Sequence, residues 1–244
     1  GRNSQIRTRA GIGTDGRDYP QHALVTTISH TLSHDGLALQ RFLPGGPLAV
    51  LPLPNQRSQI VWSDKASAVA AALSISSADF EAELSLRIGD HLGDIALDAP
   101  RQSYPLRLQL SQNYVGTRLA LIGDAAHVIH PLAGQGLNLG VRDIAALYDV
   151  VSEAIETGQD IGGAVLGAYE SWRKADVLGL ATVTDGLSLL YTSPRGPVSR
   201  PVSKVLGHAR RLGLAIVDDA EFLKTMIINE AEGLTGRAPS LLRA

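Results

Sequence analysis

One stretch of the chain constrains its fold more than any other, residues 119–143, LALIGDAAHVIHPLAGQGLNLGVRD. It opens with a short apolar run, residues 119–122, which predicts a buried strand. The acidic turn Gly123-Asp124 follows, and a loop with a glycine on each side of Gln135 then leads into an apolar-periodic helix. A carboxylate at the end of a strand and a glycine-rich loop at the start of a helix are typical ligand-binding elements of α/β proteins.

The loop at residues 131–136 predicts a site for a flat or anionic ligand. A loop that opens a helix presents free backbone N–H groups and the positive end of the helix dipole. Gly134 and Gly136 would let a ligand lie against bare backbone. The carboxylate of Asp124 would accept hydrogen bonds from ligand hydroxyl groups. A glycine-rich turn before a helix also occurs without any ligand, so this loop pattern alone identifies no site.

The stretch resembles the second flavin-binding motif of the aromatic-ring flavin monooxygenases. GDAAH at residues 123–127 is followed by residues 130–143, which match the signature HP-[LIV]-[AG]-GQG-x-N-x-G-x-x-D of the ubiquinone-biosynthesis hydroxylases at every position. The motif also lies in the expected strand–loop–helix context. The resemblance implies that FAD is bound by Gly123, Asp124, Pro131, Gly134, Gln135, Gly136, Leu137 and Asn138.

Two further segments are similar to the same family. GRNSQIR resembles the latter part of a DGxxSxxR motif through Gly1, Ser4 and Arg7, and residues 169–173, YESWR, match a YExxR pattern. The unit that binds the ADP half of FAD in this family, a GxGxxG that follows a strand, is not found in the 244 residues. We therefore expect the chain to be the C-terminal part of a longer protein, and to bind FAD weakly or not at all by itself.

The resemblance implies an enzyme whose cofactor carries the difficult chemistry. NAD(P)H would reduce the flavin, and a flavin C4a-hydroperoxide formed with O₂ would insert one oxygen atom into a polyprenylated phenol of ubiquinone biosynthesis. The protein would bind the flavin, orient the substrate and exclude water from the reaction, so no catalytic side chain is predicted. Gln40, Arg41 and Phe42 are the predicted substrate-binding residues, in a segment similar to one of these hydroxylases. An ordinary solvated strand is the alternative for them.

Two other classes of function remain open. A different flavoenzyme with the same turn and loop, such as a halogenase or an isoprenoid reductase, would share the GD and GQG segments, although the complete signature argues against it. The chain could instead be a non-catalytic module of a quinone-synthesis complex. Expected protein contacts are other quinone-biosynthesis proteins and self-association of the fragment. A cytoplasmic location is expected, with peripheral attachment to the inner membrane as the alternative.

Charge and cysteine content exclude other classes of site. A net charge of −2 and a pI near 6.4 provide no electrostatic attraction for nucleic acid. Cysteine is absent, which excludes disulfides and thiolate metal sites. The pairs His127/His130 and His30/His34 have no third ligand at a suitable spacing, so no metal site is predicted. No long uncharged apolar run indicates a transmembrane segment.

Hydrophobic periodicity around the motif predicts an α+β fold. Residues 22–30, 36–43, 48–53 and 57–62 alternate as strands with short turns between them, which predicts an antiparallel meander. Residues 104–110 and 114–122 are predicted to form two more strands. Helices are expected at residues 64–73, with Ser63 as the N-cap, and at residues 77–88, 137–155 and 161–190.

The expected organisation has four parts. Residues 1–14 would end the Asp-Gly motif region of the FAD domain, and residues 15–110 would form a β-rich substrate domain. Residues 111–192 would contribute the GD/GQG motif and long helices to the FAD domain. Residues 193–244 would form a helical tail, with helices at residues 202–216 and 220–231.

Overall fold

The computed structural model describes residues 1–131, 134–191 and 238–242. These residues divide into two compact units, one that takes in Gly1–Arg17 and Arg107–Ser188 and another that takes in Asp18–Leu106. Strands β1 (Thr14–His30) and β6 (Gln102–Ser111) supply residues to both units. The helices expected at residues 202–216 and 220–231 lie outside the described residues.

The β-rich unit is built on an antiparallel meander, as the alternating pattern predicts. β2 (Leu39–Leu43) pairs with β3 (Gly46–Leu53), β3 pairs with β4 (Arg57–Lys65), and β4 pairs with β1. The short strand β5 (Ile95–Leu97) also pairs with β1. All of these pairings are antiparallel, and the meander of β2, β3 and β4 is confirmed. β1 does not precede β2 in the sheet as a four-stranded meander would require, because it pairs with β4 on the other side.

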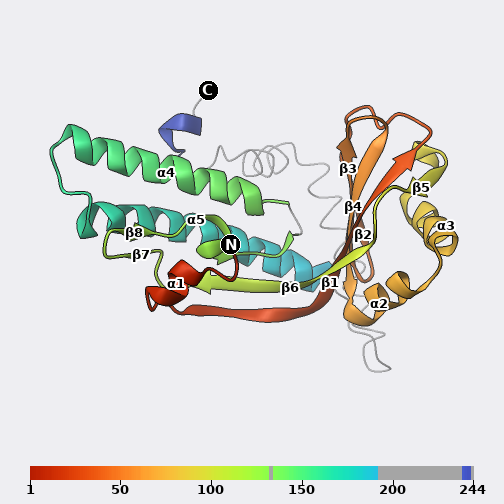
Figure 1. The fold of residues 1–244 in the computed structure, drawn as a ribbon, viewed down its shortest axis with the longest axis horizontal. Coiled ribbons are helices and arrows are strands. Elements are labelled where there is room, and N and C mark those ends of the chain that lie inside the picture. The colour runs from red at the N-terminus through yellow and green to blue at the C-terminus, as the bar shows by residue number, and fades with distance from the viewer. Residues whose placement is uncertain (132–133, 192–237, 243–244) are drawn as a thin grey trace. The chain divides into compact units, whose positions relative to one another are not determined.

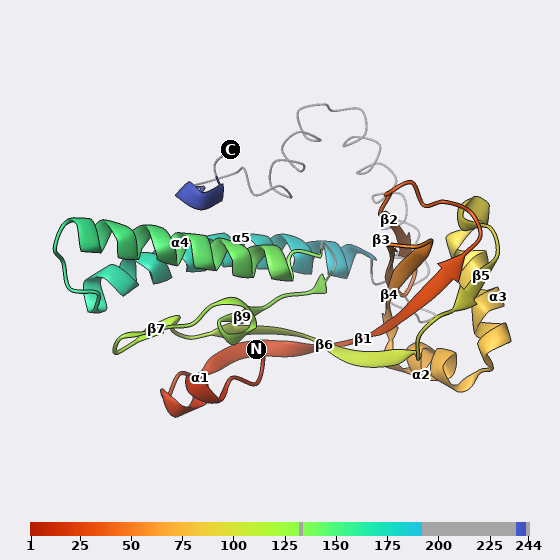
Figure 2. The same cartoon turned by 45° about the horizontal axis from the view of Figure 1, so that its top comes forward.

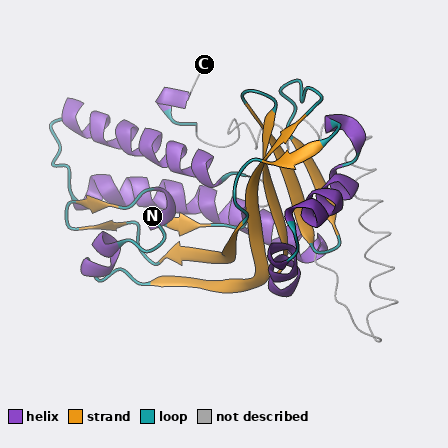
Figure 3. Cartoon of the chain, turned by 45° about the vertical axis from the view of Figure 1, so that its right-hand side comes forward, coloured by secondary structure: helices purple, strands orange, loops and turns teal. Residues whose placement is uncertain are grey.

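Two helices cover one face of this sheet, as Figure 3 shows for α2 (Ala66–Ser74) and α3 (Ser77–Ile88). The core beneath them is formed by alternate residues of the strands and by apolar residues of both helices. Its fully buried members include Leu24, Ile28, Leu48, Ile60, Trp62, Val69, Phe80 and Leu84. Successive residues of a strand point to opposite faces, so Ala23, Val25 and Thr27 point away from this core.

Three boundaries in this unit differ from the prediction. Ser63 is not a helix N-cap, because β4 continues through Lys65 and buries Ser63 opposite Ala23. β2 begins only at Leu39, since Gly36 adopts a left-handed φ of 72° in the preceding turn. β1 begins eight residues before residue 22, the expected start.

The other unit contains the motif stretch and two long helices. α4 (Gly136–Glu156) and α5 (Gly163–Tyr191) run alongside each other (Figures 1 and 2). Both helices were expected, and α4 extends one residue beyond the prediction at each end. β6 pairs with β9 (His127–Val128), and α1 (Gln5–Arg9) lies near the N-terminus. The core of this unit joins apolar residues of α4 and α5 to those of the motif stretch: Tyr114, Leu121, Ala126, Ala146, Val150, Ala154, Val165 and Tyr169.

The strand expected at residues 114–122 is interrupted, and this prediction is wrong. The chain forms a tight hairpin between β7 (Val115–Gly116) and β8 (Leu119–Ala120), in which Arg118 adopts a left-handed φ of 53°. Leu121 is buried, whereas Ile122 is 39% exposed, so residues 119–122 are not one buried strand. The motif turn itself is a short 3-10 helix, η2 (Gly123–Ala125).

Helix α4 carries an exposed apolar stripe along one side. Its members follow helical spacing and are Leu137, Val141, Ile144, Tyr148 and Ile155. Near the far end of the chain, the backbone N–H of Ser240 donates to Asp149 of α4 at 2.8 Å. Within the described residues, no helix is long and apolar enough to cross a bilayer.

Candidate functional site

The motif turn is held through its backbone by segments far apart in the sequence. The hydroxyl of Tyr169 donates to the Leu121 carbonyl at 2.8 Å. The carbonyl of Ala125 accepts two hydrogen bonds, from Nη1 of Arg7 at 2.9 Å and from Oγ of Ser111 at 3.0 Å. The N-terminal GRNSQIR segment therefore meets the GDAAH segment, and the YESWR segment meets Leu121, two residues before it. All three segments were singled out in the sequence for their resemblance to one family.

A buried carboxylate, Asp143, lies behind the turn. Its Oδ2 accepts from the backbone N–H of Gly123 at 2.8 Å and lies 2.7 Å from Nε2 of His127. Its Oδ1 accepts from Nε of Arg173 at 2.7 Å. The side chains of Asp143 and Arg173 have no exposed surface. Burial alone would raise the pKa of Asp143, but hydrogen bonds from His127 and Arg173 and the charge interaction with His127 outweigh burial and lower it.

The charged cluster continues along α5. Arg173 also bonds through Nη1 to Asp176, and Nη2 of Arg142 donates to the same Asp176 oxygen at 3.1 Å. Acidic and basic side chains thus alternate through the cluster, in the order Asp143, Arg173, Asp176 and Arg142. Burial and the Asp143 carboxylate raise the pKa of Tyr114 and Tyr169, so both phenols stay neutral at physiological pH.

The lowered pKa of Asp143 predicts a specific loss of stability in acid. A carboxyl whose pKa is lower in the folded state stabilises the fold above its unfolded pKa, about 3.9, and this contribution is lost as pH falls through the folded pKa. Asp143→Asn should therefore destabilise this unit by about 3–5 kcal/mol at neutral pH, because it breaks a buried charge pair. The difference in unfolding free energy between Asp143→Asn and wild type should become smaller below about pH 4.

Urea unfolding at pH 7 and at pH 3 measures this difference in unfolding free energy. Trp172 on α5 is the fluorescent reporter in a Trp62→Phe background. The background change leaves α5 with the only tryptophan of the chain, since the sequence has two. An equal difference between variant and wild type at pH 7 and pH 3 would show that the charge of Asp143 does not stabilise the fold.

Asp124 differs from its neighbours in the turn. Gly123 and Ala125 are each bound to the protein through backbone groups, whereas the side chain of Asp124 is exposed and makes no hydrogen bond to the described residues. An ionised carboxylate without a protein partner is free to accept hydrogen bonds from a ligand. The predicted role of Asp124 remains a prediction, and its surroundings are compatible with it.

The described residues of the loop before α4 leave space at their two glycines. A Cβ added at Gly134 or at Gly136 would meet no described atom within 4 Å. Only Gly134 has a left-handed φ, of 63°, so the backbone at Gly136 does not itself require glycine. Among the described residues, no side chain caps the N-terminus of α4, where Gln135 is the N-cap residue. The bare backbone at Gly136, the N-terminus of α4 and the Asp124 carboxylate are compatible with the predicted binding of a ribityl-flavin.

The turn and the start of α4 approach each other closely. A Cβ added at Gly140 would lie 3.4 Å from the Cα of Gly123. Gly140 is a position of the 130–143 signature, and the packing gives a physical reason for a glycine there. The same approach places the Asp124 turn beside the first two turns of α4.

The predicted substrate residues belong to the other unit. Gln40, Arg41 and Phe42 lie on β2, and all three are exposed. Arg41 shares a face of the strand with Leu39 and Leu43, which pack against the core, and Gln40 and Phe42 point to the opposite face. Their role in substrate binding stays a prediction.

The histidine pairs have structural partners. His30 Nε2 lies 3.0 Å from Oγ of Ser58, and His30 Nδ1 lies 2.7 Å from the Leu32 carbonyl. His34 Nε2 lies 2.9 Å from the Leu53 carbonyl. No group of three or more potential metal ligands occurs among the described residues.

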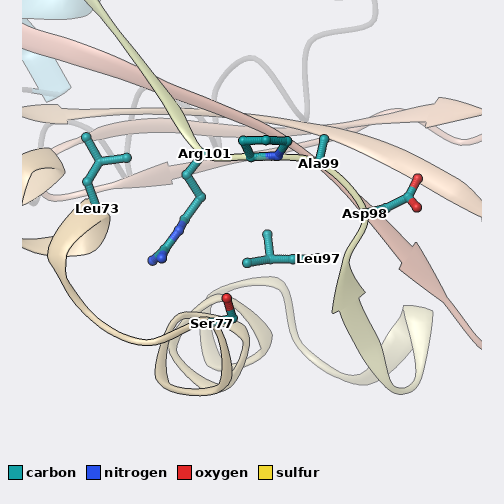
Figure 4. A pocket seen from close by; sticks show the side chains of 7 residues that line it. Leu73, Ser77, Leu97, Asp98, Ala99 and Arg101 are labelled. Atoms are coloured by element: carbon teal, nitrogen blue, oxygen red, sulfur yellow. The ribbon is translucent and has the colours of Figure 1, made fainter.

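A cavity of about 510 Å³ lies in the β-rich unit (Figure 4). The guanidinium of Arg101 points into it and donates to the carbonyls of Ala72 and Ile75 at 2.7 and 2.9 Å. Asp98 on its rim pairs with Arg57 at 2.6 Å. Arg101 thus caps the C-terminal end of α2, and both charged groups of the cavity serve the fold.

Sequence reasoning missed Asp143, His127 and Arg173 as parts of the site. In the sequence, His127 belongs to the GDAAH segment but is assigned no role there beyond that of a rejected metal ligand. Asp143 and Arg173 each occur in a recognised segment, the 130–143 signature and YESWR, and this was the available signal. Their meeting required the packing of α5 against α4, which spacing in the sequence does not reveal.

Comparison with known proteins agrees with this geometry. The sequence profile of a family described as an FAD binding domain matches residues 1–181. Ubiquinone hydroxylase UbiL of Rhodospirillum rubrum is 42% identical over 247 aligned residues, covering 100% of this chain and 56% of that protein. The 3-demethoxyubiquinol 3-hydroxylase of Escherichia coli is 34% identical over 235 residues, covering 96% of this chain and 58% of that protein. The resemblance to ubiquinone-biosynthesis hydroxylases is confirmed.

Solved structures show the same fold. The p-nitrophenol 4-monooxygenase PnpA from Pseudomonas putida superposes with a TM-score of 0.68 at 21% identity, covering 97% of this chain and 58% of that chain. At this identity the likeness concerns the fold alone. The chain spans about half the length of the curated relatives it matches.

Proposed function

The chain belongs to the FAD binding domain family, and on that premise we propose that the whole protein containing it is an FAD- and NAD(P)H-dependent aromatic hydroxylase of ubiquinone biosynthesis. One observation carries the proposal. Three segments that resemble this family bind the backbone of residues 121–125, while the Asp124 carboxylate makes no hydrogen bond to the described residues and the described glycines before α4 have space around them. A ligand site rather than a plain turn accounts for this arrangement.

The residues that would hold the cofactor come from the turn and the loop. Asp124 would bind ribityl hydroxyls. Backbone N–H groups at the start of α4 would favour negative charge on the pyrimidine edge of the flavin, because the helix dipole is positive there. The residues assigned to this task are Gly123, Asp124, Pro131, Gly134, Gln135, Gly136, Leu137 and Asn138. When bound, the flavin would be the group that reacts with O₂. The chain would bind the flavin and orient the substrate.

The substrate we propose is a polyprenylated phenol, the class expected of a ubiquinone hydroxylase. Gln40, Arg41 and Phe42 of β2 are the residues we propose to contact it. A prenyl tail keeps such a phenol in a bilayer, so the whole protein would work at a membrane surface, in contact with other quinone-biosynthesis proteins.

The test is NAD(P)H oxidation by the whole protein with and without an added prenylated phenol. Oxidation that depends on the phenol and yields a hydroxylated product supports the proposal. Halide-dependent formation of a chlorinated product, or reduction of prenyl double bonds, would instead indicate a halogenase or an isoprenoid reductase. Bound flavin without any turnover would indicate a non-catalytic module.

The chain by itself should be colourless and should self-associate. The sequence has no GxGxxG that follows a strand and opens a helix, since GIGTDG at residues 11–16 comes after α1 and leads into β1. Without that unit the contacts to the ADP half of FAD are lost, which costs roughly 4–8 kcal/mol and moves a nanomolar affinity to the micromolar-to-millimolar range. The exposed apolar stripe on α4 is the surface we expect to associate.

Gel filtration with light scattering measures both properties. Ile144→Lys on the stripe should shift the chain toward monomer, whereas Leu86→Lys, an exposed leucine of α3 in the other unit, should not. A yellow monomer that keeps its flavin through the column would contradict this expectation.

A further inference from the structure

We propose that Asp143 is a positioning residue of the flavin site, which fixes the Gly123 peptide and thereby sets where the Asp124 carboxylate is presented. The inference rests on the proposed function, because it concerns the same FAD site. Asp143 itself is fully buried and lies on the protein side of the turn. It would therefore act on the ligand only through the turn.

The backbone of the turn gives Asp143 a direct means of fixing it. Gly123 has a left-handed φ of 55°, and its N–H donates to Oδ2 of Asp143 at 2.8 Å. This hydrogen bond fixes the Ile122–Gly123 peptide plane, one residue before the ligand-facing Asp124. Without it, a glycine can rotate to many other backbone conformations at little cost.

The carboxylate is itself held from two directions. His127, which follows the turn, approaches Oδ2 at 2.7 Å, and Arg173 of α5 donates to Oδ1 at 2.7 Å. The carboxylate therefore cannot rotate to move Oδ2 away from Gly123 without breaking a buried contact to His127 or Arg173. The position of the turn is in this way tied to the packing of α4 against α5.

Only a carboxylate satisfies this set of partners. Gly123 and Arg173 present N–H donors to its two oxygens, and Nε2 of His127 shares one of those oxygens. An asparagine offers one acceptor oxygen and adds two N–H donors of its own. In Asp143→Asn, one side of the amide must therefore face a buried donor, and the Gly123 bond is lost or weakened.

The first experiment compares flavin dissociation constants in the whole protein. Asp143→Asn should bind flavin about 10- to 100-fold more weakly, by analogy with the loss of affinity when residues that orient metal ligands are replaced. Val150→Ala is the control for a general loss of stability, because it changes another buried residue of α4 whose side chain forms no hydrogen bond. Its affinity should stay within about threefold of wild type.

The second experiment has a readout that flavin and turnover do not affect. In the chain alone, NMR should show that Asp143→Asn shifts the amide proton of Gly123 upfield and changes the ring nitrogen signals of His127, since both lose a charged acceptor. Val150→Ala should leave these signals in place. Unchanged Gly123 and His127 signals in a folded Asp143→Asn chain would overturn the proposal.

Failure of this inference is distinguishable from failure of the proposed function. A wild-type whole protein that binds no flavin overturns both, whereas a wild type that binds flavin and an Asp143→Asn variant that binds it equally well overturn the inference alone. If Asp143→Asn does not fold, Arg173→Lys decides, because it keeps the charge but loses the Nε–H donor to Oδ1. A folded Arg173→Lys protein with wild-type flavin affinity and an unmoved Gly123 amide would also refute the proposal.

Discussion

Asp124→Ala is expected to weaken flavin binding by the whole protein roughly 30- to 1000-fold without changing its stability. The variant removes two charge-assisted hydrogen bonds to the ribityl chain, worth roughly 2–4 kcal/mol together. The stability should change by less than about 0.5 kcal/mol, because the Asp124 side chain is exposed and bonds to none of the described residues.

Flavin titration and thermal unfolding of the apoprotein separate the two effects. Asp124→Asn keeps one acceptor oxygen and loses the charge, so its affinity should lie between those of wild type and Asp124→Ala. Wild-type flavin affinity in a folded Asp124→Ala protein would remove Asp124 from the site.

Gly136→Val is expected to abolish flavin binding in a protein that still folds. The left-handed backbone of the loop is at Gly134, and a Cβ at Gly136 would meet no described atom within 4 Å. The valine side chain therefore has room in the apoprotein and occupies the space that we assign to the flavin ring. We expect affinity to fall by about a hundredfold or more, which corresponds to at least about 2.7 kcal/mol.

Two companion variants make this prediction specific. Gly136→Ala should stabilise the apoprotein by about 0.5–1 kcal/mol, because alanine favours a helix over glycine, while still weakening flavin binding. Gly134→Ala should destabilise the apoprotein by about 1–2 kcal/mol through its left-handed φ. A Gly136→Val protein that retains flavin and hydroxylation would mean that the loop is only a turn.

Local patterns predicted the elements that are organised by their own residues. α3 has the predicted bounds, because Ser76 caps it by accepting from the Asp79 N–H and an apolar face follows at helical spacing. The meander follows from alternation and short turns, which are local signals. Ser63 was misassigned because cross-strand pairing with Ala23 extends β4 past a residue that is also a good helix cap. The hairpin at Arg118 depends on a left-handed arginine, which has no sequence signature.

The candidate site divides in the same way. The signature identified the turn, the loop and the start of α4 because these residues are consecutive in the sequence. The cluster behind them joins Gly123, His127, Asp143 and Arg173 through contacts that span 16 to 30 residues. The Gly123 and His127 contacts exist only once the turn has packed against α4, and the Arg173 contact only once α5 has packed there, so the spacing of charged residues in the sequence could not reveal them.

Product analysis tests directly whether the whole protein hydroxylates a prenylated phenol when it is supplied with FAD, NAD(P)H, the phenol and isotopically labelled O₂. We expect a phenol that has gained a single hydroxyl group whose oxygen carries the label, identified by mass spectrometry. Unaltered phenol in the presence of bound, reducible flavin would contradict it, as would a new hydroxyl group whose oxygen comes from water.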